Sequence, residues 1–287
     1  MKSIHPNPLT APDNTTPAPS NILIVQPNIC WQDHTTNQHH LEQLLNNTGS
    51  HADLIVLPEM WASGFVTSPT PQLIGASAQA LEWMHHQSHR LDAAIVGSLP
   101  WEDTTPGTYV NRLFFVCPDG TTHHYDKRHL FGYGGETQSY HSGCRRTIVP
   151  WRGIRYLLQI CYDLRFPVWS RNQNDYDAAI YAASWPERRI QAWDTLLRAR
   201  AIENQCYVIG CNRVGTVGHT HYSGHSTLLS PLGTTLSSLP DSQEGCLPGV
   251  IDPHILQDTR THFPFLTDRD SFFIGTDDTL HTQNNPK

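Results

Sequence analysis

The sequence predicts an α/β fold, in which short buried strands alternate with longer helices. Short apolar runs rich in Ile, Val, Leu or Tyr recur along the chain, and longer stretches with helical spacing separate several of them. No internal repeat of roughly 20–50 residues and no central linker rich in Pro, Gly or Ser interrupts this pattern. We therefore expect one domain.

Most of the expected strands are apolar throughout, which is typical of strands buried on both faces of a sheet. In chain order they are Ile22–Gln26, Leu54–Leu57, Ala93–Leu99, Arg112–Val116, Ile154–Ile160, Ala178–Ala182, Tyr207–Cys211 and Thr227–Leu229. The expected helices are His34–Asn47, Ala78–Arg90 and Arg188–Asn204. In the last helix, Ile190, Trp193 and Leu197 recur at intervals of three or four residues, so one of its faces should pack on a sheet.

The two ends of the chain differ from the middle. Residues 1–20 contain several Pro and Thr and almost no large apolar side chains, and residues 276–287 are similarly polar. Such segments bury too little apolar surface to offset the entropy lost on ordering. We expect a disordered N-terminal extension over 1–20, the folded domain over 21–275 and a flexible tail over 276–287.

Charge and hydropathy argue against several classes of partner. The net charge is −7 at pH 7, and no run is rich in Lys or Arg, so nucleic acid and anionic membranes are not expected partners. No stretch reaches the roughly 18 apolar residues of a membrane-spanning helix. Because the N-terminus is polar and does not resemble a signal peptide, we expect a cytoplasmic protein.

The Cys and His residues indicate neither a disulfide framework nor a metal site. The chain has seven Cys, an odd number without C-x-x-C spacing, which indicates reduced thiols. Among the His residues, only His219, His221 and His225 form a cluster. The first two could share a strand face, but the neighbouring Gly residues favour a loop and no fourth ligand is apparent. We expect no metal.

Three segments place a reactive side chain after an apolar strand or beside an unusual turn. Glu59 follows Leu54–Pro58, Lys127 leads into a Gly-rich segment, and Cys161 closes Ile154–Ile160. Apolar surroundings raise the proton affinity of a Glu, as a general base requires. A Cys at a strand-to-turn junction can present its sulfur as a nucleophile. Taken singly, each residue could equally be a solvated charge or an inert core thiol.

Taken together, these segments resemble the nitrilase (carbon–nitrogen hydrolase) superfamily. The motifs that carry the resemblance are Leu-Pro-Glu, Asp-Lys-x-His-Leu-Phe and Cys-Tyr-Asp-x-Arg-Phe-Pro, within a match from Ile22 to Phe273. The Trp-x-Ser-Gly-Phe after Glu59 and the closing Phe263-Pro264-Phe265 are most similar to the ω-amidase branch. The Gly-rich Gly132–Gly135 departs from the family's pattern in the loop beneath the active site.

The resemblance implies a fold, a function and a set of residues. The fold is an α-β-β-α sandwich, two mixed sheets face to face with helices outside. The function is hydrolysis of the terminal amide of short α-keto acid monoamides, without a cofactor, by a protein that is at least a homodimer. The family's catalytic Glu, Lys and Cys fall on Glu59, Lys127 and Cys161, and its auxiliary Glu falls on Glu136.

The chemistry of these residue types agrees with the resemblance. A nearby ammonium should lower the thiol pKa of Cys161, and Glu59 should accept the thiol proton. Lys127 and the backbone N–H of Tyr162 would face the oxygen of the tetrahedral intermediate.

The substrate-binding residues are expected at the turn after Cys161 and in two nearby loops. Phe65 and Trp185 would form apolar walls, and Arg165 would bind the substrate's distal carboxylate. Alternatively, Arg165 pairs with a structural carboxylate such as Asp163 and never meets substrate.

Several readings stay open at this point. A papain-like Cys–His protease and a non-enzymatic binding protein on the same fold are the distant alternatives. A nitrilase, a general aliphatic amidase and an N-carbamoyl-amine hydrolase would all use the same Glu, Lys and Cys. Trp169 and Trp193 are either anchors of a dimer interface or ordinary core residues.

Overall fold

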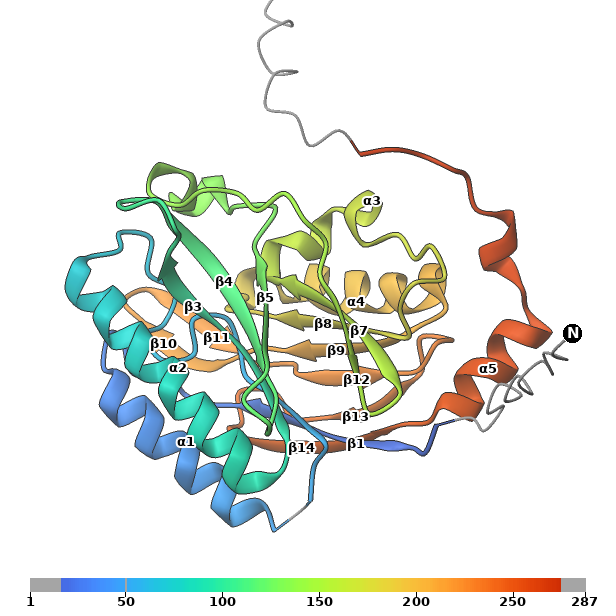
Figure 1. Ribbon diagram of the computed structural model, residues 1–287, viewed down its shortest axis with the longest axis horizontal. Coiled ribbons are helices and arrows are strands. Elements are labelled where there is room, and N and C mark those ends of the chain that lie inside the picture. Colours follow the sequence, from blue (N-terminus) through green and yellow to red (C-terminus); the bar gives the residue numbers. More distant parts are fainter. Residues whose placement is uncertain (1–16, 50, 275–287) are drawn as a thin grey trace, which may run out of the picture.

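Two mixed β-sheets lie face to face, and helices cover their outer faces (Figure 1). The structure is a computed structural model and describes residues 17–49 and 51–274. Each large sheet has six strands, and a separate two-stranded sheet lies beside them. The predicted α-β-β-α sandwich is therefore confirmed.

The first sheet has the strand order β14-β1-β2-β3-β4-β5. Strands β1, β2 and β3 run parallel, and the remaining pairs are antiparallel. The strand bounds are β1 Ser20–Gln26, β2 Leu54–Val56, β3 Ala94–Glu102, β4 Tyr109–Val116, β5 Thr122–Asp126 and β14 Gly245–Ile251. Glu59 follows the carboxyl end of β2, which is the side of a parallel sheet where ligands bind.

The second sheet repeats this plan in the order β13-β12-β9-β8-β7-β6, with β7, β8 and β9 parallel. Its strand bounds are β6 Ile148–Trp151, β7 Ile154–Ile160, β8 Ala178–Ala182, β9 Tyr207–Cys211, β12 Thr227–Leu229 and β13 Thr235–Ser238. Between β9 and β12 the chain forms the hairpin of β10 Val214–Val217 and β11 Thr220–Ser223. Cys161 follows the carboxyl end of β7, the counterpart of the position of Glu59.

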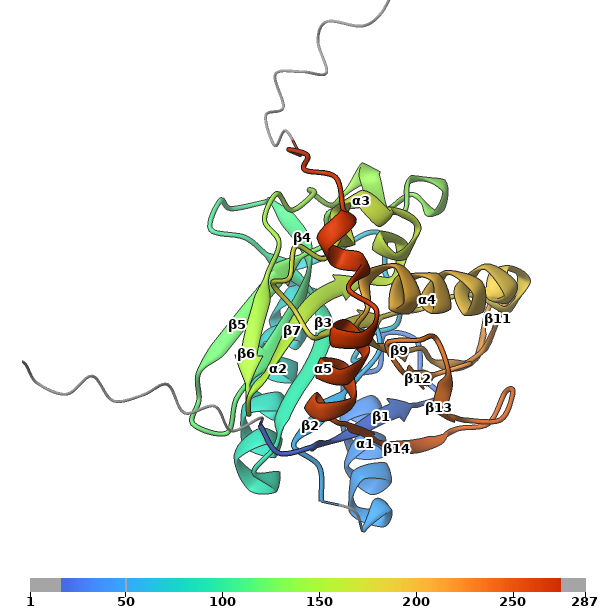
Figure 2. The ribbon, with the colours of Figure 1, turned by 90° about the vertical axis from the view of Figure 1, so that its right-hand side faces the viewer.

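The helices form the two outer layers. In Figure 2, α1 and α2 lie on one side of the strands and α4 lies on the other. The helix bounds are α1 His34–Thr48, α2 Pro71–Leu91, α3 Pro167–Ser170, α4 Ile190–Asn204 and α5 Pro253–His262. No helix within 17–49 or 51–274 is long and apolar enough to cross a bilayer.

Strand β1 shows how alternation divides the core. Ile22 and Ile24 pack in the cluster between the two sheets, whereas Leu23 and Val25 pack with Leu41 of α1 on the outer face. Both faces of the strand are buried, so its sequence is apolar without interruption. The same holds for β2, β8 and β9, whose residues are all buried.

All the predicted strands form, within three residues at either end, and the first predicted helix begins at His34 as expected, whereas the other two begin at different residues. Helix α2 begins at Pro71, seven residues before the predicted Ala78, because Thr70 caps it and accepts a hydrogen bond from Leu73 N at 3.2 Å. Helix α4 begins at Ile190, since the preceding residues form a 3-10 turn.

The interpretation of Trp169 and Trp193 as interface anchors is wrong, and the core interpretation holds. Both side chains are buried within the chain. The indole N–H of Trp169 donates to Tyr125 Oη at 3.0 Å, and that of Trp193 donates to the carbonyl of His225 at 3.0 Å.

The chain ends were expected to be disordered over 1–20 and flexible over 276–287. Ser20 already belongs to β1, so the ordered body begins one residue earlier than the predicted boundary. Residues 17–19 are described and form neither helix nor strand, whereas residues 1–16 and the expected tail lie outside the described residues.

Candidate active site

Cys161 is the first residue after β7, at the start of the 3-10 turn Cys161–Arg165. Its φ of +43° lies in the left-handed region, which residues with a side chain rarely adopt. The reversal of the backbone presents the side chain to a cavity at the end of the sheet. Strain of this kind is typical of functional positions.

Glu59 lies opposite Cys161 and is fully buried. Its Oε2 accepts a hydrogen bond from the backbone N–H of Ser184 at 3.0 Å, and its Oε1 accepts one from Asn111 Nδ2 at 2.8 Å. The thiol of Cys161 donates to the same carboxylate. Glu59 is therefore held where it can take the thiol proton.

Lys127 follows β5 and is also fully buried. Its Nζ donates to Oε1 of Glu59 at 2.7 Å and to Oε2 of Glu136 at 2.8 Å. One ammonium group is thus shared by two carboxylates. The structure brings together all four residues that the sequence singled out as catalytic.

Asn111 of β4 is a member of this cluster that the sequence analysis missed. Its amide donates to Glu136 Oε1 at 3.0 Å as well as to Glu59. The backbone N–H of Phe131 donates to Glu136 Oε2 at 2.6 Å, so the Gly-rich loop is tied to the cluster. The available signal was an amide beside Arg112 in a strand whose other residues are apolar or aromatic.

Burial sets the proton affinities of this cluster. Burial raises the pKa of Glu59, and the attraction of Lys127 only partly opposes it. Burial alone would lower the pKa of Lys127, but Glu136 and Glu59 outweigh it and raise that pKa, so the ammonium stays charged. The pKa of the Cys161 thiol is raised well above its usual value by burial and by the charge of Glu59.

Lys127 lowers the thiol pKa of Cys161, as expected, but burial and the charge of Glu59 raise that pKa by more. The raised pKa favours the thiol of Cys161 over the thiolate, and Glu59 is the neighbouring base that can accept its proton.

Asp163 joins the turn of Cys161 to the loop of Lys127. Its buried carboxylate accepts hydrogen bonds from Ile160 N at 3.0 Å, Tyr125 Oη at 2.8 Å, His129 N at 2.9 Å and His129 Nδ1 at 2.8 Å. These donors come from both sides of the site. Asp163 thus fixes the two loops relative to each other.

A cavity of about 280 Å³ opens above Cys161. This volume is near the lower end for ligand pockets, roughly 300 Å³, so it suits a small substrate. Its lining includes every residue predicted to bind substrate, and these are Phe65, Tyr162, Arg165 and Trp185. Glu59, Lys127 and Cys161 form its floor.

The predicted apolar walls differ in their surroundings. The ring of Phe65 lies with its centroid 5.4 Å from Lys127 Nζ, so it shields the ammonium. The ring of Tyr162 meets Phe131 edge-on, with 5.1 Å between centroids. The guanidinium of Arg165 lies over Trp185, with its Cζ 4.9 Å from the ring centroid.

The alternative that Arg165 pairs with Asp163 is wrong. The four donors of Asp163 do not include Arg165. Within the described chain no carboxylate forms an ion pair with Arg165, which faces the cavity.

Two further cations at the cavity escaped the sequence analysis. Arg188 lies exposed at its rim, and Arg189 lines it while stacking on Phe131, with Cζ 5.0 Å from the ring centroid. Tyr222 lines the cavity, and the Cζ atom of the buried Arg213 lies 4.7 Å from the centroid of the Tyr222 ring. Burial lowers the pKa of Arg213 to about 10, so it still carries a charge at neutral pH.

The His segment was expected to be a loop, and only His221 lies in a strand, β11. His219 lies in the turn of the β10–β11 hairpin, and His225 follows β11. His221 Nδ1 is 3.0 Å from Thr216 Oγ1, and His225 pairs with Asp194 at 3.0 Å. In residues 17–49 and 51–274 no group of three or more His, Cys, Asp or Glu is arranged to hold a metal ion.

Comparisons with known proteins agree with the geometry. Residues 22–261 match the family model described as carbon-nitrogen hydrolase. The chain is 45% identical over 255 residues to omega-amidase YafV of Yersinia enterocolitica, covering 88% of this chain and 98% of the relative. It is 30% identical over 253 residues to 2-oxoglutaramate amidase of Bacillus subtilis, covering 86% of this chain and 96% of that relative.

Among solved structures, the chain is similar to XC1258 of Xanthomonas campestris, a CN-hydrolase superfamily protein with an arsenic adduct in its active site. The TM-score is 0.83 at 38% identity, and the match covers 90% of this chain and 99% of that one. A papain-like fold is thereby excluded.

Proposed function

The chain belongs to the carbon–nitrogen hydrolase family, as its motifs predict, and we propose that it is an ω-amidase. The reaction removes the terminal amide of a short α-keto acid monoamide, such as α-ketoglutaramate or α-ketosuccinamate, and yields the dicarboxylic acid and ammonia. The observation that carries the proposal is a cavity that is lined by guanidinium groups and has Glu59, Lys127 and Cys161 at its floor.

Charge is the reason to favour an acidic amide. The whole chain has a net charge of −7, yet Arg165, Arg188 and Arg189 gather at one small cavity. A guanidinium binds a carboxylate through two parallel hydrogen bonds, each contributing about 1.5–3 kcal/mol in a partly dry site. A neutral amide or nitrile lacks the carboxylate that would accept these two hydrogen bonds.

The first half of the reaction acylates the enzyme. The Cys161 sulfur attacks the amide carbonyl carbon as its proton moves to Glu59. Lys127 and the backbone N–H of Tyr162 stabilise the oxyanion, and one such donor contributes about 3 kcal/mol to lowering the barrier. Glu59 then donates the proton to the departing nitrogen, so ammonia leaves and a thioester remains.

The second half regenerates the thiol. Glu59 takes a proton from water, and the resulting hydroxide attacks the thioester carbonyl. The oxyanion again faces Lys127, and its collapse breaks the carbon–sulfur bond. The proton held by Glu59 returns to sulfur, and the acid product leaves.

An ammonia-release assay tests the proposal. The panel contains α-ketoglutaramate, α-ketosuccinamate, glutaramate, an aliphatic nitrile and an N-carbamoyl amino acid. We expect the highest kcat/KM with a keto acid monoamide, and a mass-spectrometric acyl adduct on the peptide that contains Cys161. A preference for the nitrile, for the carbamoyl compound or for a neutral amide would instead support the nitrilase, N-carbamoyl-amine hydrolase or general amidase alternative.

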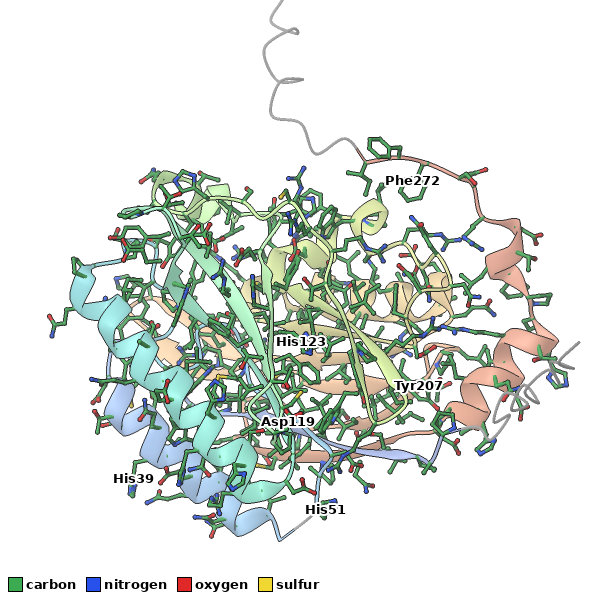
Figure 3. The ribbon with its side chains drawn as sticks, in the orientation of Figure 1. His39, His51, Asp119, His123, Tyr207 and Phe272 are labelled. Carbon is green, nitrogen blue, oxygen red and sulfur yellow. The ribbon has the colours of Figure 1, made fainter. Side chains whose placement is uncertain are left out.

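The proposal includes a homodimer. Large apolar side chains are exposed on α3, α4 and the segment after α5, and these are Val168, Ile202, Phe265 and Phe273. Figure 3 shows Phe272 at the edge of the molecule, on the same segment. Light scattering at micromolar concentration should give a mass at least twice that of one chain, and a monomer mass would contradict the dimer.

The expected location is the cytoplasm. The argument in its favour is that all seven Cys residues are free thiols, as in proteins of reducing compartments. Fractionation of cells that express the tagged full-length chain tests this, and recovery in the envelope or the medium would contradict it.

A further inference from the structure

Arg189 is a cavity cation to which the proposed reaction gives no role. It is half-buried, and it lies at the end of the short 3-10 turn that precedes α4. In the part of the chain that the structure describes, none of the ion pairs involves Arg189. A guanidinium held without a carboxylate in a ligand-sized cavity is suited to bind an acceptor on the ligand.

The loop of Phe131 holds Arg189 in place. The guanidinium lies over the Phe131 ring, and the backbone of Phe131 is fixed by its hydrogen bond to Glu136. The ring fits because residue 134 is Gly, since a Cβ there would lie 2.5 Å from Phe131 Cδ1. The Gly-rich segment that departs from the family's pattern therefore shapes the surface on which Arg189 rests.

Arg189 and Arg165 form a pair at the cavity. Each guanidinium stacks on an aromatic ring, Phe131 for one and Trp185 for the other. Both guanidinium groups line the same cavity as Cys161, and burial together with the charges of Arg188 and Arg165 lowers the pKa of Arg189. Two adjacent planar donors match a ligand with two adjacent acceptors, and a 2-oxo acid offers a keto oxygen beside a carboxylate.

We propose that Arg189 is a specificity residue that donates a hydrogen bond to the keto oxygen of the substrate while Arg165 binds the neighbouring carboxylate. In an ω-monoamide the keto carbon lies nearer to the scissile amide than the carboxylate does. Arg189 rests on the Phe131 ring, which meets the ring of Tyr162 beside the nucleophile edge-on, so its guanidinium is assigned to the keto oxygen. This inference rests on the proposed function.

The test compares substrates that differ only in the keto group. We would measure kcat/KM for α-ketoglutaramate and glutaramate, and for α-ketosuccinamate and succinamate, in the wild type and in Arg189→Met. We expect kcat/KM of the keto substrates to fall about 10- to 100-fold, which is about 1.4–2.8 kcal/mol at 1.4 kcal/mol per factor of ten. The substrates without a keto group should change less than about threefold.

Three further variants separate the contact from general damage. Arg145→Met removes an exposed Arg outside the cavity and should leave kcat/KM unchanged for all four substrates. Gly134→Ala should displace the Phe131 ring and reduce the keto preference without altering Arg189. Gly132→Ala is its matched control, because a Cβ there meets nothing closer than 3.5 Å.

The outcomes distinguish this inference from the proposed function. If the wild type releases no ammonia from either keto acid monoamide, the proposed function fails. If it does so but hydrolyses the counterparts without a keto group equally well, only the inference fails. Equal losses on both substrate types in Arg189→Met, or no loss, also overturn the inference.

Discussion

Lys127→Met is the substitution whose effect the structure defines most fully. It removes the only cation in contact with Glu59 and Glu136 among the described residues, and it leaves two fully buried carboxylates joined by Asn111. Removing one partner of a buried ion pair costs about 3–5 kcal/mol. Against a typical total of about 5–15 kcal/mol, the variant should be severely destabilised at pH 7–8.

The loss should depend on pH in a defined direction. Burial already raises the pKa of Glu59 above 4.5, and removal of Lys127 should raise it further. A carboxyl group whose pKa is raised by folding stabilises the fold below its unfolded pKa, and this stabilisation is lost as pH rises through the folded pKa. The stability gap between wild type and Lys127→Met should therefore be small near pH 5 and grow toward pH 8.

A second substitution separates stability from catalysis. In Lys127→Met/Glu136→Gln a neutral amide replaces one of the two carboxylates. The free energy of unfolding, measured in urea at pH 7.5, should therefore be at least about 1.5 kcal/mol higher than in the single variant. Activity should not recover, because the oxyanion donor is still missing, and it should stay at least about 100-fold below wild type. The reasoning is refuted if Lys127→Met is as stable as wild type at pH 8. It is also refuted if the double variant recovers none of the lost unfolding free energy, because the two buried carboxylates then do not destabilise each other.

Three further predictions concern the thiol, its support and the substrate. Because the pKa of Cys161 is raised, the ultraviolet thiolate absorbance of wild type minus Cys161→Ala should be flat from pH 6 to 8, and a thiolate signal at pH 7 would contradict the base mechanism. Asp163→Asn places an amide N–H group against N–H and O–H donors, so the free energy of unfolding should fall by about 3 kcal/mol. Its kcat should fall at least tenfold with KM nearly unchanged, whereas a rise in KM alone would assign Asp163 to substrate binding. Arg165→Lys should raise KM strongly for keto acid monoamides but barely for a neutral amide, and equal losses would assign Arg165 to scaffolding.

The buried strands could be predicted from the sequence because each is apolar on both faces. The missed strands lie mostly at sheet edges, where one face meets solvent and the apolar signal weakens. Strand β5 contains two His and has exposed positions, and β13 is mostly exposed. Helix α5 was missed because helices were sought by their apolar spacing. Its start signal, with Asp252 as the N-cap and Pro253 as the first helical residue, was not used.

Glu59, Lys127 and Cys161 could be predicted because each lies after a strand in a motif that resembles the family's, whereas Glu136, in a 3-10 turn, came from the resemblance alone. The positions of Arg189 and Asn111 could not, since their roles depend on neighbours distant in sequence. Nothing in the sequence distinguishes the exposed Arg188 from Arg189, and only the stacking on Phe131 does so. The raised thiol pKa was missed for the same reason, because the depth of burial is a property of the folded chain.

Several features that lower stability meet at the floor of the cavity. Three fully buried charged side chains, a nucleophile candidate with φ of +43°, and an Asn111 Oδ1 without a hydrogen-bond partner in the described chain all lie within one cluster. A buried ion pair contributes little to folding compared with apolar residues of similar volume. Packing alone does not account for such a cluster, so its position beneath a cavity whose walls carry Arg165 and Arg189 supports the proposed catalytic role.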